Sequence, residues 1–332
     1  MRYLWVILII LLLTACSGED NATDKQHSIN EKTIDNLGFV IDEGYRINFA
    51  SNPRIMSYEE GILSLGYEYH SQELKNEPSA RGYIAFSDDG LNFYDNRKFN
   101  LGENKGKGIQ LADGTYRRYQ FSPDKCGFTN EYSENGNNWQ NEDDLAYDLS
   151  ENDDCWAGVY TTFVDEEGGV VLLYNNDLEN EEGKKDIYVR RAYSTDNGKS
   201  FAFEGTVIDI NDKYGDFMSL ADPNAIVLDD GRILLILMNQ DAGEPKPPLG
   251  RVGDLYGFIS EDGGKTFDSG HYLFGWADFD EFEVRSLNDP KILQMNDGSY
   301  KIYVAAMIPA EEGDDEENDY KYVIVSATSK TL

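Results

Sequence analysis

The feature that most constrains the fold is a short turn motif that recurs along the chain. Residues 194–201 and 260–267 both read S-x-D-x-G-x-[ST]-F, and versions one residue shorter begin at Ser87 and Ser133. In such a turn the serine and the acidic or amide side chain bond to the backbone, and the glycine supplies a positive φ. We expect a degenerate fifth copy at Ser326. The motif as a whole predicts a series of similar β-hairpins.

A second predicted hairpin precedes each of these turns. Its turn ends in a glycine, and a run of strand-forming residues follows. These glycines are Gly61, Gly114, Gly168, Gly231 and Gly298. Successive motif serines lie 46 to 66 residues apart, and repeating units with two hairpins each are typical of four-stranded propeller blades. We therefore predict an all-β protein, a β-propeller of five four-stranded blades, with six blades as the alternative.

The repeated turn resembles the Asp-box, or BNR repeat, of the sialidase-like β-propeller superfamily. This resemblance covers most of the chain after its N-terminal segment and implies a structural role for the turns. We letter the strands of a blade A to D from the axis outward. The last unit stops after its third strand, so we expect residues 45–49 to supply the fourth and close the ring, which protects edge strands.

The N-terminal residues predict export and a lipid anchor. Met1-Arg2 and the apolar residues 4–13 have the charge and length of a signal peptide. Residues 13–16, Leu-Thr-Ala-Cys, resemble the lipobox of bacterial lipoproteins, which implies cleavage before Cys16 and its acylation. An ordinary secretory signal is the alternative. We expect a signal peptide at 1–15, a flexible tether at 16–42 and a propeller at 43–332, anchored in the bacterial cell envelope on its periplasmic or outer side.

The charge of the chain excludes some partners. It has 62 acidic and 29 basic residues, a formal net charge of −33, which repels nucleic acid and anionic membranes. We expect no nucleic-acid partner, membrane contact through the anchor only, and a monomer. The acidic run at residues 311–319 lacks the ordered spacing of a calcium loop. We therefore expect no metal site and no cofactor, with Ca²⁺ as the alternative. Three histidines give little support to zinc or Ser-His-Asp chemistry.

The strand order predicts on which face of the propeller the loops and the two remaining cysteines lie. With Cys16 acylated, Cys126 and Cys155 are left to form a disulfide in an oxidising compartment. The short A–B turns and the repeated C–D turns share one face, so the long B–C loops and the beginnings of the A strands lie on the other. Both cysteines belong to that second face, in adjacent blades. Variable loops on a rigid scaffold commonly carry binding.

The beginnings of the A strands are predicted to ring the mouth of the axis. An [ND]-P pair recurs there, at residues 52–53, 222–223 and 289–290, and its proline fixes the backbone. Aromatic side chains beside carboxylates and amides suit a sugar ligand. The predicted glycan contacts are Asn52, Arg54, Trp156, Tyr160, Asn224, Arg285 and Asn288. The alternative is that Asp222 and Asp289 only cap the channel by bonding backbone amides.

Two glycosidase groups are similar to short segments of the chain. Residues 222–227, Asp-Pro-Asn-Ala-Ile-Val, resemble the opening strand of five-bladed arabinanase- and xylosidase-type hydrolases. That resemblance implies a set of carboxyls across the axis, for which Asp222, Asp289 and Glu283 are the candidates, although Asn52 stands where an aspartate is expected. Residues 54–56 and 221–234 resemble sialidase segments, but an aspartate occupies the position of the sialidase glutamate.

Three functions follow as hypotheses. The first is an envelope lipoprotein that binds glycans, or hydrolyses them as an exo-acting glycosidase, on the face that carries the B–C loops. The second is a non-catalytic propeller that docks a protein partner on the same face, and the third is a structural envelope component. A propeller fold alone does not decide among them.

Overall fold

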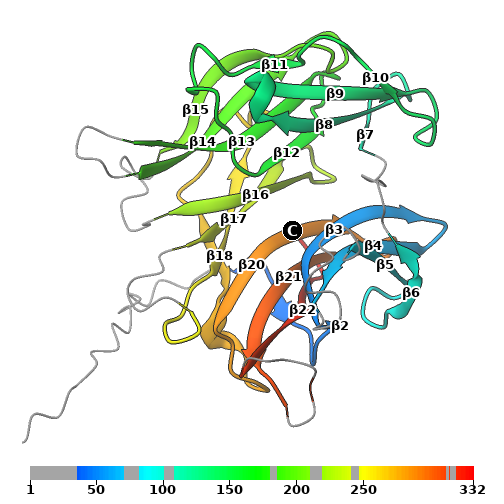
Figure 1. The fold of residues 1–332 in the computed structure, drawn as a ribbon, viewed down its shortest axis with the longest axis vertical. Coiled ribbons are helices and arrows are strands. Elements are labelled where there is room, and N and C mark those ends of the chain that lie inside the picture. The colour runs from blue at the N-terminus through cyan, green and yellow to red at the C-terminus, as the bar shows by residue number, and fades with distance from the viewer. Residues whose placement is uncertain are drawn as a thin grey trace, which may run out of the picture. The chain divides into compact units, whose positions relative to one another are not determined.

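The computed structural model describes residues 36–70, 82–100, 108–179, 185–209, 219–240, 247–311, 314 and 319–332. The predicted signal peptide, Cys16 and most of the tether lie outside these ranges. The described chain is all-β and forms five antiparallel blades, as predicted (Figure 1). It also has two short 3₁₀ helices, Pro123–Lys125 and Trp276–Asp278. Within the described ranges, no helix is long and apolar enough to cross a membrane.

The strands follow one another outward from the axis in each blade. Blade one comprises β3 (Ala50–Glu59), β4 (Ile62–Tyr69), β5 (Gly82–Ser87) and β6 (Tyr94–Asn100). Blade two comprises β7 (Ile109–Gln110), β8 (Tyr116–Ser122), β9 (Gly127–Ser133), β10 (Gln140–Asn141) and β11 (Tyr147–Asp148), the last two both pairing with β9. Blade three comprises β12 (Tyr160–Val164), β13 (Val170–Glu179), β14 (Lys185–Ser194) and β15 (Ala202–Asp209). Blade four comprises β16 (Leu220–Val227), β17 (Ile233–Asn239), β18 (Asp254–Ser260) and β19 (His271–Phe274).

Blade five joins the two ends of the described chain. It comprises β20 (Ser286–Gln294), β21 (Tyr300–Pro309) and β22 (Tyr320–Ser329), with β1 (Val40–Ile41) and β2 (Ile47–Asn48) completing it. Ile47 pairs with Ile324, and Val40 pairs with Thr328. The predicted closing segment, residues 45–49, therefore contains a strand of this blade. The sheet also includes Val40–Ile41, which our sequence-based boundaries had assigned to the tether.

The hydrophobic core lies between neighbouring blades. Alternate residues of a strand point to opposite faces of its sheet, and β17 shows what this does here. Its Leu234 and Ile236 pack toward blade five, whereas Ile233 and Leu235 pack toward blade three, and all are 0–1% exposed. A strand buried on both faces needs a continuous apolar run. Residues 233–238, Ile-Leu-Leu-Ile-Leu-Met, supply one.

The repeated turns have the hydrogen bonds that their sequence predicts. In blade four the Ser260 hydroxyl accepts the amide of Gly264 at 2.8 Å, and an Asp262 carboxylate oxygen accepts the amides of Lys265 and Thr266 at 3.0 and 2.9 Å. Partial burial raises the pKa of Asp262, but these and other hydrogen bonds outweigh it and lower that pKa. The turns that begin at Ser87 and Ser194 repeat the pattern.

We expected a fifth copy of the motif at Ser326, and this prediction is wrong. Ser326 lies inside β22, where its hydroxyl donates to Asp42 at 2.6 Å. In blade four the motif serine, Ser260, pairs with the first residue of strand B, and the residue in that register in blade five is Ser329, opposite Tyr300. The prediction failed because β22 continues to Ser329, so that the register falls three residues later.

The repeated turns also hold neighbouring blades together. A buried arginine or tyrosine on one blade donates to a backbone carbonyl of the next blade's turn. The pairs are Arg117 to Asn197 (2.7 Å), Tyr119 to Gly198 (2.8 Å), Arg191 to Gly263 (3.2 Å) and Tyr303 to Gly90 (2.7 Å). Because an unpaired buried carbonyl is costly, these bonds fix the spacing between blades. The turns therefore have a structural role.

The predicted disulfide is present. Cys126 follows the 3₁₀ helix between β8 and β9, and Cys155 lies before β12 in the next blade. Their Cα atoms are 4.4 Å apart, and the two sulfurs are bonded. This places the B–C loop of blade two beside the beginning of blade three's innermost strand, as the strand order requires.

Candidate functional site

The innermost strands of three blades share one irregularity at the axis. β3, β16 and β20 pass side by side, and each pairing with its neighbouring strand skips two residues (Figure 1). The skipped pair is [ND]-P in every case: Asn52-Pro53, Asp222-Pro223 and Asp289-Pro290. Proline has no amide hydrogen for the ladder, so it favours a bulge there. The recurring pair therefore places one polar side chain from each of three blades at equivalent positions.

These polar residues have an uncommon backbone conformation. Asn52, Asp222 and Asp289 have φ of 53°, 56° and 57°, in the left-handed region that costs most residues about 1–2 kcal/mol. Asn and Asp tolerate this region better than other side chains that carry a Cβ. Residues held in such conformations cluster at functional sites. The arrangement turns the three side chains out of the regular pleat of their strands.

Asp222 and Asp289 form a carboxyl pair. The backbone amide of Asp289 donates to an Asp222 carboxylate oxygen at 3.4 Å, so the two residues lie within the reach of one side chain. Asp222 is 8% exposed. Burial is the larger of two effects that raise the pKa of Asp222 to about 6, and the negative charge of Asp289 is the smaller. This bond is one of the backbone caps that the alternative interpretation predicted, yet it leaves the proton on Asp222 available near neutral pH.

Lys291 supplies a positive charge to this pair. It follows Asp289-Pro290 in β20, and its Nζ donates to the Pro290 carbonyl at 3.1 Å. Burial lowers the pKa of Lys291, and the charges of Asp289 and Asp222 act against that change. In turn Lys291 lowers the pKa of both carboxyls, although burial leaves that of Asp289 raised overall.

Blade one completes the group with an amide, a cation and a third carboxyl. The Asn52 Nδ2 donates to Glu68 Oε1 at 2.9 Å, and an Arg54 guanidinium nitrogen lies 3.4 Å from the same oxygen. Glu68, on β4, also raises the pKa of Asp289, whereas Arg54 lowers it. We call Asn52, Arg54, Glu68, Asp222, Asp289 and Lys291 the axial cluster. It contains three carboxyls and two cations.

The structure does not place Glu283 with the carboxyl pair. Its carboxylate is 46% exposed and ion-paired with Arg285 at 2.7 Å and with Arg251. Arg285, a predicted glycan contact, also donates to the Pro248 carbonyl at 3.1 Å. Glu283 precedes β20, outside the bulge where the other candidates lie. Chain proximity to Asp289 suggested the grouping, but two neighbouring arginines hold the side chain.

The other predicted contacts have differing surroundings. The side-chain oxygen Oδ1 of Asn224 accepts the Ile292 amide at 2.8 Å and so links blades four and five. Asn288 donates to Ser286 at 3.0 Å. The Tyr160 hydroxyl donates to the Tyr119 carbonyl, and its ring packs against Phe128. Trp156 is 46% exposed.

Sequence reasoning missed Glu68 and Lys291. Lys291 had a signal, because it stands two residues after a predicted site aspartate, in the position that Arg54 and Asn224 occupy in their blades. Glu68 had no local signal. It joins the cluster only because β4 pairs with β3, with Glu68 opposite Ser51. Within the described ranges, no group of three or more His, Cys, Asp or Glu side chains is arranged to hold a metal ion.

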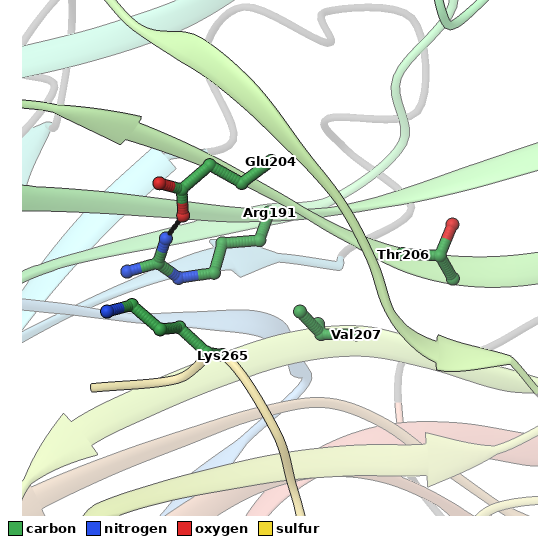
Figure 2. A pocket seen from close by; sticks show the side chains of 5 residues that line it. All are labelled: Arg191, Glu204, Thr206, Val207 and Lys265. Carbon is green, nitrogen blue, oxygen red and sulfur yellow. Dashed lines mark ion pairs between the residues drawn. The ribbon is translucent and has the colours of Figure 1, made fainter. Parts of the chain in front are cut away.

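Two described pockets lie between blades, and the carboxyl pair lines neither. One, of about 370 Å³, is lined by Arg191, Glu204, Thr206, Val207 and Lys265 (Figure 2). The Arg191 and Lys265 side chains extend toward the same side of it, and Glu204 is ion-paired with the guanidinium (Figure 2). The other, of about 480 Å³, is lined by polar residues that include the acids Glu142 and Asp196. Both adjoin the repeated turns that join blades, so we assign them to blade packing.

Solved structures are similar to the chain in fold. A thermostable family-43 glycoside hydrolase matches with a TM-score of 0.54 and 12% identity, over 86% of this chain and 91% of that one. The sucrose-6-phosphate hydrolase from Lactobacillus gasseri matches with a TM-score of 0.53 and 15% identity, over 85% of this chain and 60% of that one. A GH43_12 protein from a capybara gut metagenome matches with a TM-score of 0.52 and 10% identity, over 86% of this chain and 53% of that one. At these identities the likeness shows the propeller fold alone. No protein-family model and no curated protein matches the chain.

Proposed function

We propose that this chain hydrolyses glycosidic bonds at the axial cluster, with Asp222 as the general acid. The observation that carries the proposal is the pair Asp222–Asp289. A buried carboxyl, Asp222, and a half-buried one, Asp289, stand on adjacent innermost strands, and the pKa of Asp222 is raised to about 6. Paired carboxyls with separated protonation are the groups that glycoside hydrolysis requires.

The charge balance of the cluster supports this assignment. With all groups ionised, Glu68, Asp222 and Asp289 carry three negative charges against the two positive charges of Arg54 and Lys291. One added proton makes the group neutral, and burial favours the neutral state. We assign that proton to Asp222, whose pKa is raised to about 6 by burial and by the charge of Asp289. Lys291 and Arg54 favour the ionised form of Asp289.

The proposed reaction consumes one water molecule. Asp222 gives its proton to the glycosidic oxygen, the bond from that oxygen to the anomeric carbon breaks, and the leaving sugar departs as an alcohol. The carboxylate of Asp289 stabilises the positive charge that develops on the sugar ring. Water then adds to the anomeric carbon, and its proton returns to the carboxylate of Asp222.

The test compares two Asp→Asn variants on opposite faces of the propeller. Wild type, Asp222→Asn and Asp230→Asn are assayed on a panel of aryl glycosides and neutral polysaccharides. Asp230 lies in the A–B turn of blade four and is exposed, so Asp230→Asn keeps wild-type activity. Asp222→Asn lowers kcat by about 100-fold or more, the range for loss of a general acid.

Two outcomes contradict the proposal. One is a wild-type protein that is silent on the whole panel, and a pull-down of a protein partner by that silent protein would support the docking alternative instead. The other is an Asp222→Asn variant that keeps more than a tenth of the wild-type kcat.

The setting that we propose is the bacterial cell envelope, with the chain exported and lipid-anchored through Cys16 as a monomer. The repeated turns, similar to the Asp-boxes of sialidase-like propellers, support placement in that superfamily. The net charge of −33 favours a neutral glycan over an acidic one because like charges repel. No cofactor enters the proposed reaction.

A further inference from the structure

Trp156 differs from the other two tryptophans that the structure describes. An arginine lies over the ring of each of the others: Arg118 over Trp139 at 4.2 Å, and Arg251 over Trp276 at 5.8 Å. Trp156 is 46% exposed and packs against the edge of Phe121, with centroids 5.6 Å apart and planes at 88°. A large aromatic surface therefore faces solvent on the side of the propeller that carries the axial cluster.

The backbone that carries Trp156 is held unusually firmly for a loop. The preceding residue is in the disulfide with Cys126. The Trp156 amide donates to the Asp153 carbonyl at 2.9 Å, and its carbonyl accepts Asn176 Nδ2 at 2.8 Å. Exposed loop residues normally lack such support. Firm placement of an exposed aromatic ring lowers the entropy lost when that ring binds a ligand.

The buried side chain of Asp153 fixes this loop to the neighbouring strands. Its side chain is 0% exposed and accepts four hydrogen bonds. The donors are Tyr147 (3.2 Å), Tyr174 (3.0 Å), Asn176 (3.1 Å) and Arg190 (2.8 Å). A buried carboxylate is stable only when it is paired and hydrogen-bonded in this way. The network joins the loop to strands β11, β13 and β14, so the position of Trp156 is fixed by the body of blades two and three.

Ring contacts run in series from Trp156 through Phe121 and Phe128 to Tyr160. Phe121 contacts Phe128 at 5.7 Å, and Phe128 contacts Tyr160 at 5.1 Å. Tyr160 lies near enough to Arg54 for the guanidinium charge to act on its hydroxyl. The rings behind Trp156 therefore belong to the hydrophobic core of blades two and three, in which Phe128 is 0% exposed.

We propose that Trp156 is a stacking platform for a sugar ring of the substrate other than the ring cleaved at Asp222, so that the substrate is a neutral oligosaccharide or polysaccharide. This inference rests on the proposed function. The ligand is neutral because the chain carries a net charge of −33, which repels acidic glycans. A flat apolar ring face in a fixed position suits the C–H face of a sugar.

The experiment measures binding separately from cleavage. Affinity electrophoresis of the full chain in gels containing arabinan, xylan, β-glucan, mannan or polygalacturonate compares Asp222→Asn, Asp222→Asn/Trp156→Ala and Asp222→Asn/Trp139→Ala. The inactive background keeps the glycan intact. Trp139 is the matched control, since it lies on the opposite face beneath Arg118. We expect Trp156→Ala to raise the dissociation constant for at least one neutral polysaccharide about ten-fold or more, as loss of a central aromatic contact commonly does, and Trp139→Ala to leave it within two-fold.

Thermal melts of all three variants exclude unfolding as the cause, and Trp156→Phe restores most of the binding. The inference is overturned if the Trp156→Ala and Trp139→Ala proteins bind equally. It is also overturned if the Asp222→Asn protein is slowed by polygalacturonate alone or by none of the polysaccharides. Failure of the proposed hydrolysis gives a different pattern, in which glycans are bound through Trp156 and wild type cleaves none of them.

Discussion

The raised pKa of Asp222 makes a quantitative prediction about stability. The Asp222 carboxyl has a pKa of about 6 in the folded protein and about 3.9 in the unfolded chain. It therefore contributes less to the free energy of folding at high pH, where it is ionised in both states, than at low pH, where it is protonated in both. The folded state holds a proton between pH 4 and 6 that the unfolded chain has released. Wild type therefore loses stability as pH rises through this range. One pKa unit corresponds to about 1.4 kcal/mol, so the loss is about 3 kcal/mol above pH 7.

Asp222→Asn removes this titration and keeps an oxygen that can accept the Asp289 amide. We expect the variant and wild type to have similar free energies of unfolding at pH 3.5, where Asp222 is protonated. At pH 8 the variant is more stable by about 3 kcal/mol, an increase in melting temperature of about 5 °C for a chain of this size. The loss of activity that we predict for the same variant would make the site one where function costs stability.

Calorimetric melts at pH 3.5, 5, 6.5 and 8 measure the difference. Asp89→Asn is the control of opposite sign. Partial burial raises the pKa of Asp89, but hydrogen bonds from Asn92 and Leu91 outweigh it, and the net pKa is lowered. Asp89→Asn is therefore less stable than wild type at neutral pH, and the difference in stability between the two becomes smaller as pH falls. A stability difference for Asp222→Asn that does not change with pH would refute the reasoning.

Three further perturbations test other parts of the molecule. Cys155→Ser opens the loop closed with Cys126, which spans a sequence separation of 29; we expect a loss of about 3–4 kcal/mol in the free energy of unfolding, and an equal stability of variant and reduced wild type confirms the cause. Lys291→Met raises the pKa of Asp222, so the limb of the pH–activity profile assigned to Asp222 moves to higher pH, and Lys291→Arg moves it back; an unchanged limb contradicts the assignment. Arg117→Met removes the hydrogen bond to the Asn197 carbonyl of the next blade and the ion pair with the half-buried Glu142, and should cost about 3–5 kcal/mol, measured by denaturant unfolding; a loss below 1 kcal/mol would show that these two contacts together are not stabilising.

The repeated turn and the apolar runs were sufficient to predict the blades. Each turn is a local structure, because its hydrogen bonds join residues at most four apart, and local patterns are legible in a sequence. The run of residues 233–238 shows burial on both faces of a strand in the same direct way. The disulfide was expected because Cys126 and Cys155 remain once Cys16 is acylated, and strand order supported it by placing both on one face in adjacent blades.

Sequence reasoning failed where strand register mattered. It placed the fifth turn at Ser326, although the pairing of β21 with β22 puts Ser329 in that position. It grouped Glu283 with Asp289 because they are neighbours in the chain, and it could not anticipate that Arg285 and Arg251 hold the Glu283 carboxylate. Side-chain direction in a strand depends on one residue of register, which short-range patterns do not specify.

The sequence by itself determined the propeller, its two faces and the three [ND]-P pairs at its axis, because these depend on local turn chemistry and on the absence of an amide hydrogen in proline. Only the tertiary structure decided which charges meet there. Glu68, Asp222 and Lys291 come from three blades, and burial among one another, rather than the type of any one residue, raises the pKa of Asp222. Electrostatic coupling acts through space, so it appears only when the ring of blades brings distant segments together.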